Sequence, residues 1–154
     1  MSFLLSSPRR RACAALASVA VLALASGCVA WKTSSSPVTL GATLTGAAEV
    51  PPVQSSGTGT LQAWYSKETG SLRWRLTYTG LSGAATAAHF HGPAAVGANA
   101  GVLVPIGAPY TGSQEGVSAI TPAQASDLLA GRWYVNVHTQ QHPGGEIRGQ
   151  VTVQ

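Results

Sequence analysis

All four histidines of this 154-residue chain fall into two short clusters. His89 and His91 stand two residues apart, and His138 and His142 stand four apart nearer the C-terminus. Side chains two apart on a β-strand share one face, so the imidazoles of the first cluster can approach one ion together. If the second cluster folds beside the first, four imidazole nitrogens surround that ion. The spacing therefore predicts a metal site formed by His89, His91, His138 and His142.

The available donors restrict the metal and leave several interpretations open. Imidazole suits copper, zinc, nickel and iron. Met1 is the only methionine, and Cys13 and Cys28 are the only cysteines, so the expected folded domain contributes no sulfur ligand. Its few, scattered carboxylates argue against a calcium or magnesium site. The alternatives to a shared metal site are histidines that only make structural hydrogen bonds, and histidines with acid–base or binding roles.

Three polar residues near the second cluster are candidates to support the site. Asn136 lies two residues before His138 and shares its strand face. Glu146 could orient a ligand imidazole through the free ring N–H, and Arg148 could steer an anion toward the metal. The alternatives are a strand hydrogen bond for Asn136 and a salt-bridged or solvated strand face for Glu146 and Arg148.

The segments that must position these residues have the pattern of short β-strands. Residues 71–79 alternate apolar and polar side chains, the clearest period of two in the chain. Thr121, Pro122 and Gln124 form a capping box that starts a short helix, and Gly131 ends it. The expected strands are 38–44, 58–65, 71–79, 84–91, 101–107, 116–120, 132–139 and 146–153. About eight strands and one short helix predict an all-β antiparallel sandwich or barrel.

The N-terminus is typical of an exported bacterial protein. A basic cluster at residues 9–11 precedes an apolar run at 12–25, which is too short to span a bilayer. The run ends at 24–28 in a sequence that resembles a lipobox, with Cys28 as the lipid-bearing residue. We expect a signal peptide at 1–27, a tether at 28–37 and the folded domain at 38–154. The alternative is an ordinary signal peptide with an incidental cysteine.

Export and lipidation would place the domain in the periplasm, anchored to a membrane and most plausibly the outer one. Removal of residues 1–27 takes away three of the nine basic side chains and leaves a net charge of about +1 against five acidic ones. No nucleic-acid partner is therefore expected. A metal ion and the membrane are the expected partners, and a homodimer is left open.

Several motifs resemble the CHRD domain family over about residues 38–154. The matching segments are 44–52, 89–94, 128–139 and 142–150. His89, His91 and His138 also resemble, more weakly, the copper ligands of copper-zinc superoxide dismutases, which are Greek-key β-sandwiches. That likeness implies copper, with zinc as the alternative, and makes His142 a fourth ligand or a supporting group. Residues 92–115 contain no His, Asp or Cys, so a zinc subsite is not expected.

The sequence thus predicts a copper-binding periplasmic lipoprotein that serves copper handling or resistance. One alternative is an enzyme, a copper-only dismutase or small oxidase. The other is a metal-free protein-binding or adhesion module.

Overall fold

The computed structural model describes residues 35–154. The predicted signal peptide, Cys28 and the first part of the predicted tether lie outside these residues. Within them, no helix is both long and apolar enough to cross a membrane.

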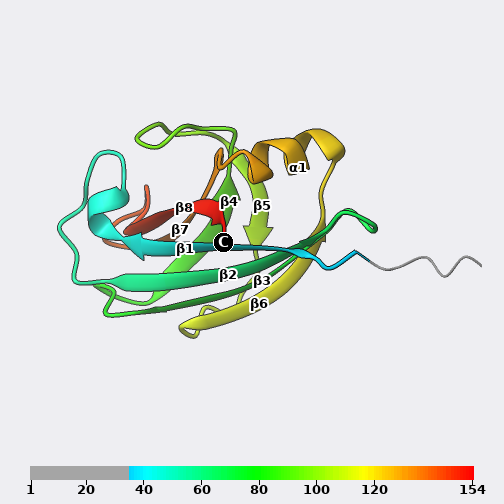
Figure 1. Cartoon of the computed structure of the whole chain (residues 1–154). Helices are drawn as coiled ribbons and strands as arrows, with labels where there is room; N and C mark the ends of the chain where they lie inside the picture. The colour runs from blue at the N-terminus through cyan, green and yellow to red at the C-terminus, as the bar shows by residue number, and fades with distance from the viewer. Residues whose placement is uncertain (1–34) are drawn as a thin grey trace, which may run out of the picture. The chain divides into compact units, whose positions relative to one another are not determined.

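The described chain forms one eight-stranded sheet, a short α-helix and a single 3-10 turn (Figure 1). The elements are β1 (Val38–Thr45), η1 (Gly46–Ala48), β2 (Thr58–Ser66), β3 (Ser71–Thr79), β4 (Ala85–His91), β5 (Val102–Ile106), β6 (Ser113–Ala119), α1 (Pro122–Leu129), β7 (Trp133–Thr139) and β8 (Ile147–Val153). The strand order is β5-β4-β7-β8-β1-β2-β3-β6, and every paired neighbour is antiparallel. The all-β prediction, with eight strands and one short helix, is confirmed.

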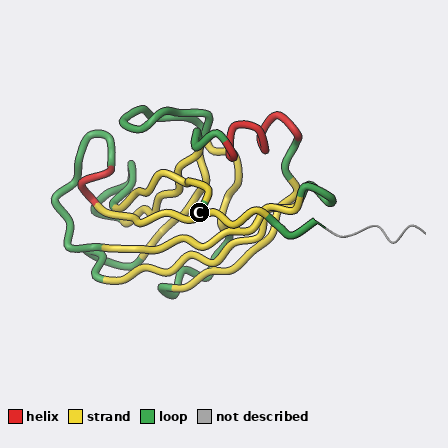
Figure 2. Tube along the Cα trace, viewed as in Figure 1, coloured by secondary structure: helices red, strands yellow, loops and turns green. Residues whose placement is uncertain are grey.

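The sheet curls into a nearly closed barrel (Figure 2). Its two terminal strands in the spatial order, β5 and β6, approach each other without pairing. The chain passes from β3 to β4 and from β6 to β7 by connections that cross between distant strands, which is Greek-key connectivity. These crossings bring β4 and β7 together, although more than forty residues separate them in sequence.

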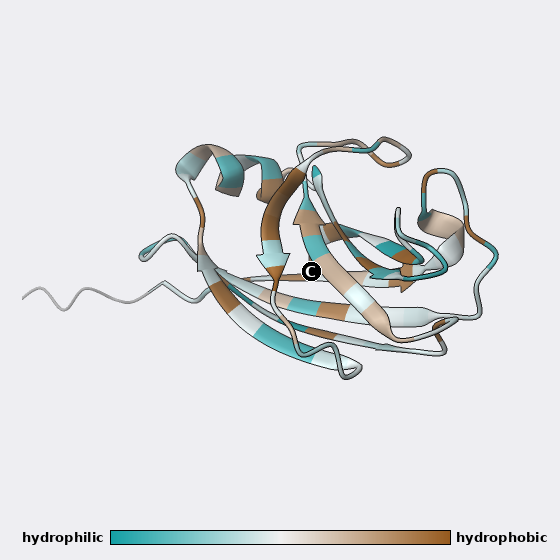
Figure 3. Cartoon of the chain, turned by 180° about the vertical axis from the view of Figure 1, so that it is seen from behind, coloured by the Kyte–Doolittle hydropathy of each residue, from teal (hydrophilic) through white to brown (hydrophobic). Residues whose placement is uncertain are grey.

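Alternation along the strands fills the barrel with apolar side chains. In β3, Leu72, Trp74 and Leu76 are buried while the residues between them are exposed. Figure 3 shows the resulting alternation of hydrophobic and hydrophilic bands along the strands. The core contains, among others, Leu40, Leu44, Leu61, Phe90, Trp133, Val135, Val137, Ile147 and Val151.

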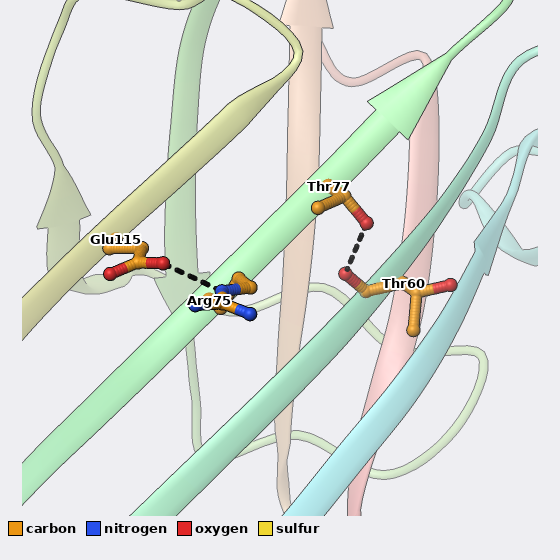
Figure 4. Close-up of polar contacts among 4 residues, drawn as sticks. All are labelled: Thr60, Arg75, Thr77 and Glu115. Atoms are coloured by element: carbon orange, nitrogen blue, oxygen red, sulfur yellow. Dashed lines mark hydrogen bonds and ion pairs between the residues drawn. The ribbon is translucent and has the colours of Figure 1, made fainter.

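The outer face of β3 carries polar pairs (Figure 4). Arg75 and Glu115, on the neighbouring β6, form an exposed ion pair at 2.6 Å. Thr77 Oγ1 donates to the carbonyl oxygen of Thr60 at 3.5 Å. Glu115 belongs to β6 because this strand starts at Ser113, three residues earlier than the expected 116. Exposed pairs of this kind contribute little to stability, so the buried apolar faces of the strands matter more for the fold.

The helix and its caps match the expectation. The Thr121 side chain accepts from the Gln124 backbone N–H while the Gln124 side chain accepts from the Thr121 N–H, which completes the capping box. Leu128 is fully buried, and Gly131 follows the helix with φ of +70°, a conformation that favours glycine.

Candidate metal centre

The two strands that carry the histidine clusters are hydrogen-bonded neighbours. In the register of β4 and β7, His89 lies opposite Asn136, and His138 lies opposite Ala87. Side chains two residues apart share a face, so His89 and His91 on β4 lie beside Asn136 and His138 on β7. The antiparallel pairing thus assembles the site from two distant parts of the chain.

Three imidazoles converge at this face. One ligand nitrogen from each of His89, His91 and His138 lies within 4.8 Å of the others, and no further His, Cys, Asp or Glu of residues 35–154 joins this group. Nitrogens that bind one ion at about 2.0–2.1 Å lie at most about 4.2 Å apart, so a small inward rotation closes the site. His91 and His138 are each 8% exposed, whereas His89 is only half-buried. The cluster therefore opens toward solvent on the His89 side.

Backbone carbonyls fix the tautomers of two imidazoles. His138 Nδ1 donates to the Pro143 carbonyl oxygen at 3.0 Å, and His91 Nδ1 donates to the Ala100 carbonyl oxygen at 3.0 Å. A carbonyl oxygen only accepts, so each Nδ1 carries the proton and each Nε2 presents a lone pair. The His89 Nδ1 lies 3.1 Å from His138 Nε2. The Nε2 lone pairs of His91 and His138 therefore point into the same small volume, and His89 Nδ1 lies beside them.

Asn136 adds an oxygen to this volume. Its Oδ1 lies 2.9 Å from His138 Nε2 and 3.0 Å from His91 Nε2. The amide nitrogen is directed to the other side, where the Asn136 side chain hydrogen-bonds to the carboxyl group of Glu49. With that orientation, three acceptor atoms face one another: Asn136 Oδ1 and the Nε2 atoms of His91 and His138. The proton on His89 Nδ1 can satisfy only one of them. A cation at the centre would be attracted by all of them.

The electrostatics keep these imidazoles available as ligands. Burial, and then the neighbouring His138 and His91, lower the pKa of His89. Burial also lowers the pKa of His138, with His91 acting in the same direction and the hydrogen bond to Pro143 opposing it. Metal binding needs neutral imidazole, so a lowered pKa extends the neutral form to more acidic solution.

Comparison with family models matches residues 40–151 to the CHRD domain. The chain belongs to the CHRD family. No curated protein matches it at a significant level. The match covers all three histidines of the cluster, and also Glu49, Asn136 and Arg148.

A stack of three side chains supports the cluster of this CHRD domain. The His91 ring lies on the Tyr134 ring with centroids 4.7 Å apart and an interplanar angle of 1°. The guanidinium carbon of Arg148 lies 3.4 Å from the centroid of the same Tyr134 ring. Tyr134 and Arg148 also bind the loop after β4: the Tyr134 hydroxyl contacts the N–H and carbonyl of Ala100. The loop whose carbonyl fixes the His91 tautomer is held in place by this stack.

Arg148 does not take the role that the sequence suggested. The side chain is 2% exposed, and its nitrogens donate to Asn99 Oδ1 at 2.9 Å and to the Ala98 carbonyl oxygen at 2.7 Å. A guanidinium buried beneath a loop cannot guide an anion in from solvent. The alternative of a salt-bridged or solvated strand face does not describe Arg148 either, because the side chain is buried and neither ion pair of residues 35–154 includes it.

Glu146 also differs from both expectations. Its carboxylate accepts from Ser55 Oγ at 2.7 Å, from the Ser82 N–H at 2.7 Å and Oγ at 2.6 Å, and from Thr139 Oγ1 at 2.7 Å. All of these donors are hydroxyl or backbone groups, and none is an imidazole. The residue is fully buried, so the solvated alternative is wrong too. Glu146 therefore links loops near β7 and β8, and none of its hydrogen bonds goes to a proposed metal ligand.

His142 lies outside the three-histidine group, in the loop between β7 and β8. Its backbone N–H donates to Thr139 Oγ1, and its carbonyl accepts from Thr139 and Gly145. The side chain is half-buried. These contacts shape the loop that delivers the Pro143 carbonyl to His138, and the role of His142 as a fourth ligand stays a prediction.

Glu49 is the site residue that the sequence reasoning missed. It is not among the candidate site residues that the sequence suggested, yet it is 5% exposed and contacts Asn136. Burial raises the pKa of its carboxyl, although the charge of Arg148 and hydrogen bonds from Val50 and Asn136 oppose the rise. One signal was present: a single carboxylate within the otherwise apolar, family-matching stretch 46–53.

Proposed function

We propose that this CHRD domain binds one copper ion through His89, His91 and His138, and that it serves copper handling or resistance. The observation that carries the proposal is the convergence of imidazole nitrogens and the Asn136 oxygen on one point, with a single proton to share among them.

The donor set fits copper and, as the alternative, zinc. Imidazole is a ligand of both, and copper(II) binds such sites more tightly than any other divalent metal of the first transition row. The described residues contain neither cysteine nor methionine, so the site cannot be a thiolate or thioether centre. The exported, lipid-anchored location expected from residues 1–37 would place such a site outside the cytoplasm. This location is itself part of the proposal.

Each residue has a definite task in binding the ion. The Pro143 and Ala100 carbonyls hold His138 and His91 with their Nε2 lone pairs inward. For His89 to bind through Nδ1, its proton must leave that atom, and the same ring can carry it on Nε2 without becoming charged. The bound ion would supply Lewis acidity, and a redox couple if it is copper.

The test is a metal titration of the mature chain by isothermal calorimetry, with Cu(II) and Zn(II) in parallel. We expect one copper per wild-type chain. His138→Ala and His89→Ala should each lower the affinity for copper by at least about 100-fold, because two imidazoles cannot replace three preorganised ones. His142→Ala is the matched variant from the same cluster, and it reveals whether this residue is a ligand.

Two outcomes would overturn the proposal. If the wild-type chain binds no copper, the histidines form only a hydrogen-bonded network, and the metal-free protein-binding module becomes the better hypothesis. If the His89 and His138 variants titrate like the wild type, the metal binds elsewhere. Tighter binding of Zn(II) than Cu(II) would reassign the metal but not the site.

The partial exposure of His89 favours the enzyme alternative as a second candidate. A copper-only dismutase or small oxidase needs an open position that a small anion can reach. A superoxide assay on the copper-loaded protein separates catalysis from simple binding. Activity that disappears in the His89→Ala variant would support the enzyme.

A further inference from the structure

Arg148 is a buried cation close to the proposed metal site. The residue is 2% exposed, and its guanidinium stays charged in any protein environment. The groups that contact it are neutral: the Asn99 side-chain oxygen, the Ala98 carbonyl and the face of Tyr134. Burial of a charge without a contacting counter-ion carries a large desolvation cost.

No carboxylate neutralises Arg148 at contact distance. The ion pairs of residues 35–154 are Arg75–Glu115 and Arg132–Asp127, and neither includes Arg148. Glu49 feels the positive charge but lies beyond ion-pair distance, and its side chain is engaged with Asn136 instead. The positive charge therefore acts through space on the buried carboxyl of Glu49, whose pKa it lowers, and on the aromatic stack, without a direct ion pair.

The surroundings include a proposed copper ligand. Tyr134 lies between Arg148 and His91, 3.4 Å from the guanidinium carbon and 4.7 Å, centroid to centroid, from the imidazole. One aromatic ring thus separates the cation from His91. Tyr134 is 3% exposed, so little water screens the interaction.

From this arrangement we propose that Arg148 makes the site prefer the cuprous ion, Cu(I), over the cupric ion, Cu(II). The proposal rests on the copper function proposed above and names the oxidation state of its ligand. A fixed positive charge repels a divalent ion about twice as strongly as a monovalent one at the same place. Three imidazoles and an amide oxygen contribute no negative charge to offset this repulsion.

The expected effect is large enough to measure. Removal of the Arg148 charge should change the ratio of the Cu(I) and Cu(II) affinities by about tenfold in favour of Cu(II). For a one-electron couple a tenfold change corresponds to about 59 mV. The reduction potential of the bound copper should fall by that amount.

The experiment compares Arg148→Gln with Arg148→Lys. Gln removes the charge and keeps an amide donor for the Ala98 carbonyl, whereas Lys keeps the charge and loses the flat stacking group. Dissociation constants for Cu(I) and Cu(II) are measured by competition with chelators, Cu(I) under anaerobic conditions. Voltammetry of the copper-loaded protein gives the potential independently.

We expect the affinity ratio and the potential to shift in Arg148→Gln and to stay within about threefold of the wild type in Arg148→Lys. Equal shifts in both variants, or no shift in Arg148→Gln, would show that charge does not set the preference. Either result overturns this inference while copper binding itself persists. Loss of all copper binding in the wild type instead removes the proposed function.

A measurement on the unaltered protein covers the case in which Arg148→Gln fails to fold. The wild-type potential is compared with that of copper in excess free imidazole at the same pH, where no fixed cation is present. A higher potential in the protein supports the inference. An equal or lower potential contradicts it.

Discussion

Two buried glutamates of this domain have pKa values shifted in opposite directions because their surroundings differ. Hydroxyl and backbone donors surround Glu146, and although burial alone raises its pKa, the hydrogen bonds from Ser82, Thr139 and Ser55 lower it to about 2. Glu49 has an oxygen without a partner, and its pKa is raised by burial. Hydrogen bonds therefore favour the ionised form of Glu146, whereas burial disfavours the ionised form of Glu49 beside the proposed metal site.

Glu146 should make the stability of the domain depend on pH in acid solution. Its folded-state pKa is about 2 against 4.5 for an ordinary glutamate, so its contribution to stability is complete above about pH 4.5 and is lost as the pH falls toward 2. At 1.36 kcal/mol per pKa unit, the contribution is about 3 kcal/mol. Urea unfolding of the wild type at pH 6, 4 and 3 should show this loss.

In the Glu146→Gln variant the same series should be flatter, because no charge is gained or lost at this position. Glu115→Gln is the matched control: this carboxylate is exposed in its pair with Arg75, and its loss should change stability by less than about 1 kcal/mol. If the stability of the wild type and that of Glu146→Gln change in parallel with pH, the role assigned to Glu146 is wrong.

At the residue scale the sequence predicted which histidines could share a site, and the structure brings His89, His91 and His138 together, but the residues that support them were not predicted. His89, His91 and His138 could be predicted because rare residue types at a strand spacing carry their own signal. The states of Glu49, Glu146 and Arg148 depend on which loops cover them. Those loops are brought in by residues such as Ser55, Ser82 and Asn99, far away in sequence.

At the scale of elements, the loop between β7 and β8 connects the metal site with the sheet. It delivers the Pro143 carbonyl to His138, and it contains Gly145, where φ is +130°. A Cβ atom on Gly145 would lie 2.7 Å from Asn136 Nδ2 and closer still to Glu49 Oε1. Only glycine leaves room there for the contact between Glu49 and Asn136.

Gly145→Ala should therefore displace Glu49 and Asn136 and weaken copper binding. We expect a loss of affinity of about tenfold, comparable to other changes behind metal ligands, and a destabilisation of about 1–3 kcal/mol. Gly144→Ala is the control from the same loop, because its added Cβ meets no atom within 4 Å. Calorimetric titration of both variants is the measurement, and equal affinities would refute the assigned role of Gly145.

The elements themselves were largely predictable, whereas their pairing was not. The alternation in β3 and the capping box of α1 are local signals, and both are confirmed. The start of β6 at Ser113 was missed because residues 113–115 are polar and lack apolar alternation, and their pairing with β3 is long-range. The crossings that set β4 beside β7 are long-range, and no local pattern encodes them.

At the scale of the whole molecule, the three histidines join a strand from the middle of the domain's sequence to a strand near its C-terminus. His89 and His91 come from β4, and His138 comes from β7, which also pairs with β8 near the C-terminus. An ion bound to all three exists only when these strands are in register. Metal binding and folding should therefore be coupled.

This coupling predicts that copper raises the melting temperature of the domain. At a free concentration 100 times the dissociation constant, a ligand of the folded state stabilises it by about 2.7 kcal/mol. For a domain of this size that corresponds to a shift of about 10 °C in a calorimetric scan. A chelator should reverse the shift, and the His138→Ala variant should melt at the same temperature with and without copper. A shift that survives this substitution would mean that the stabilising ion binds outside the cluster, because any ion that binds only the folded chain raises its melting temperature.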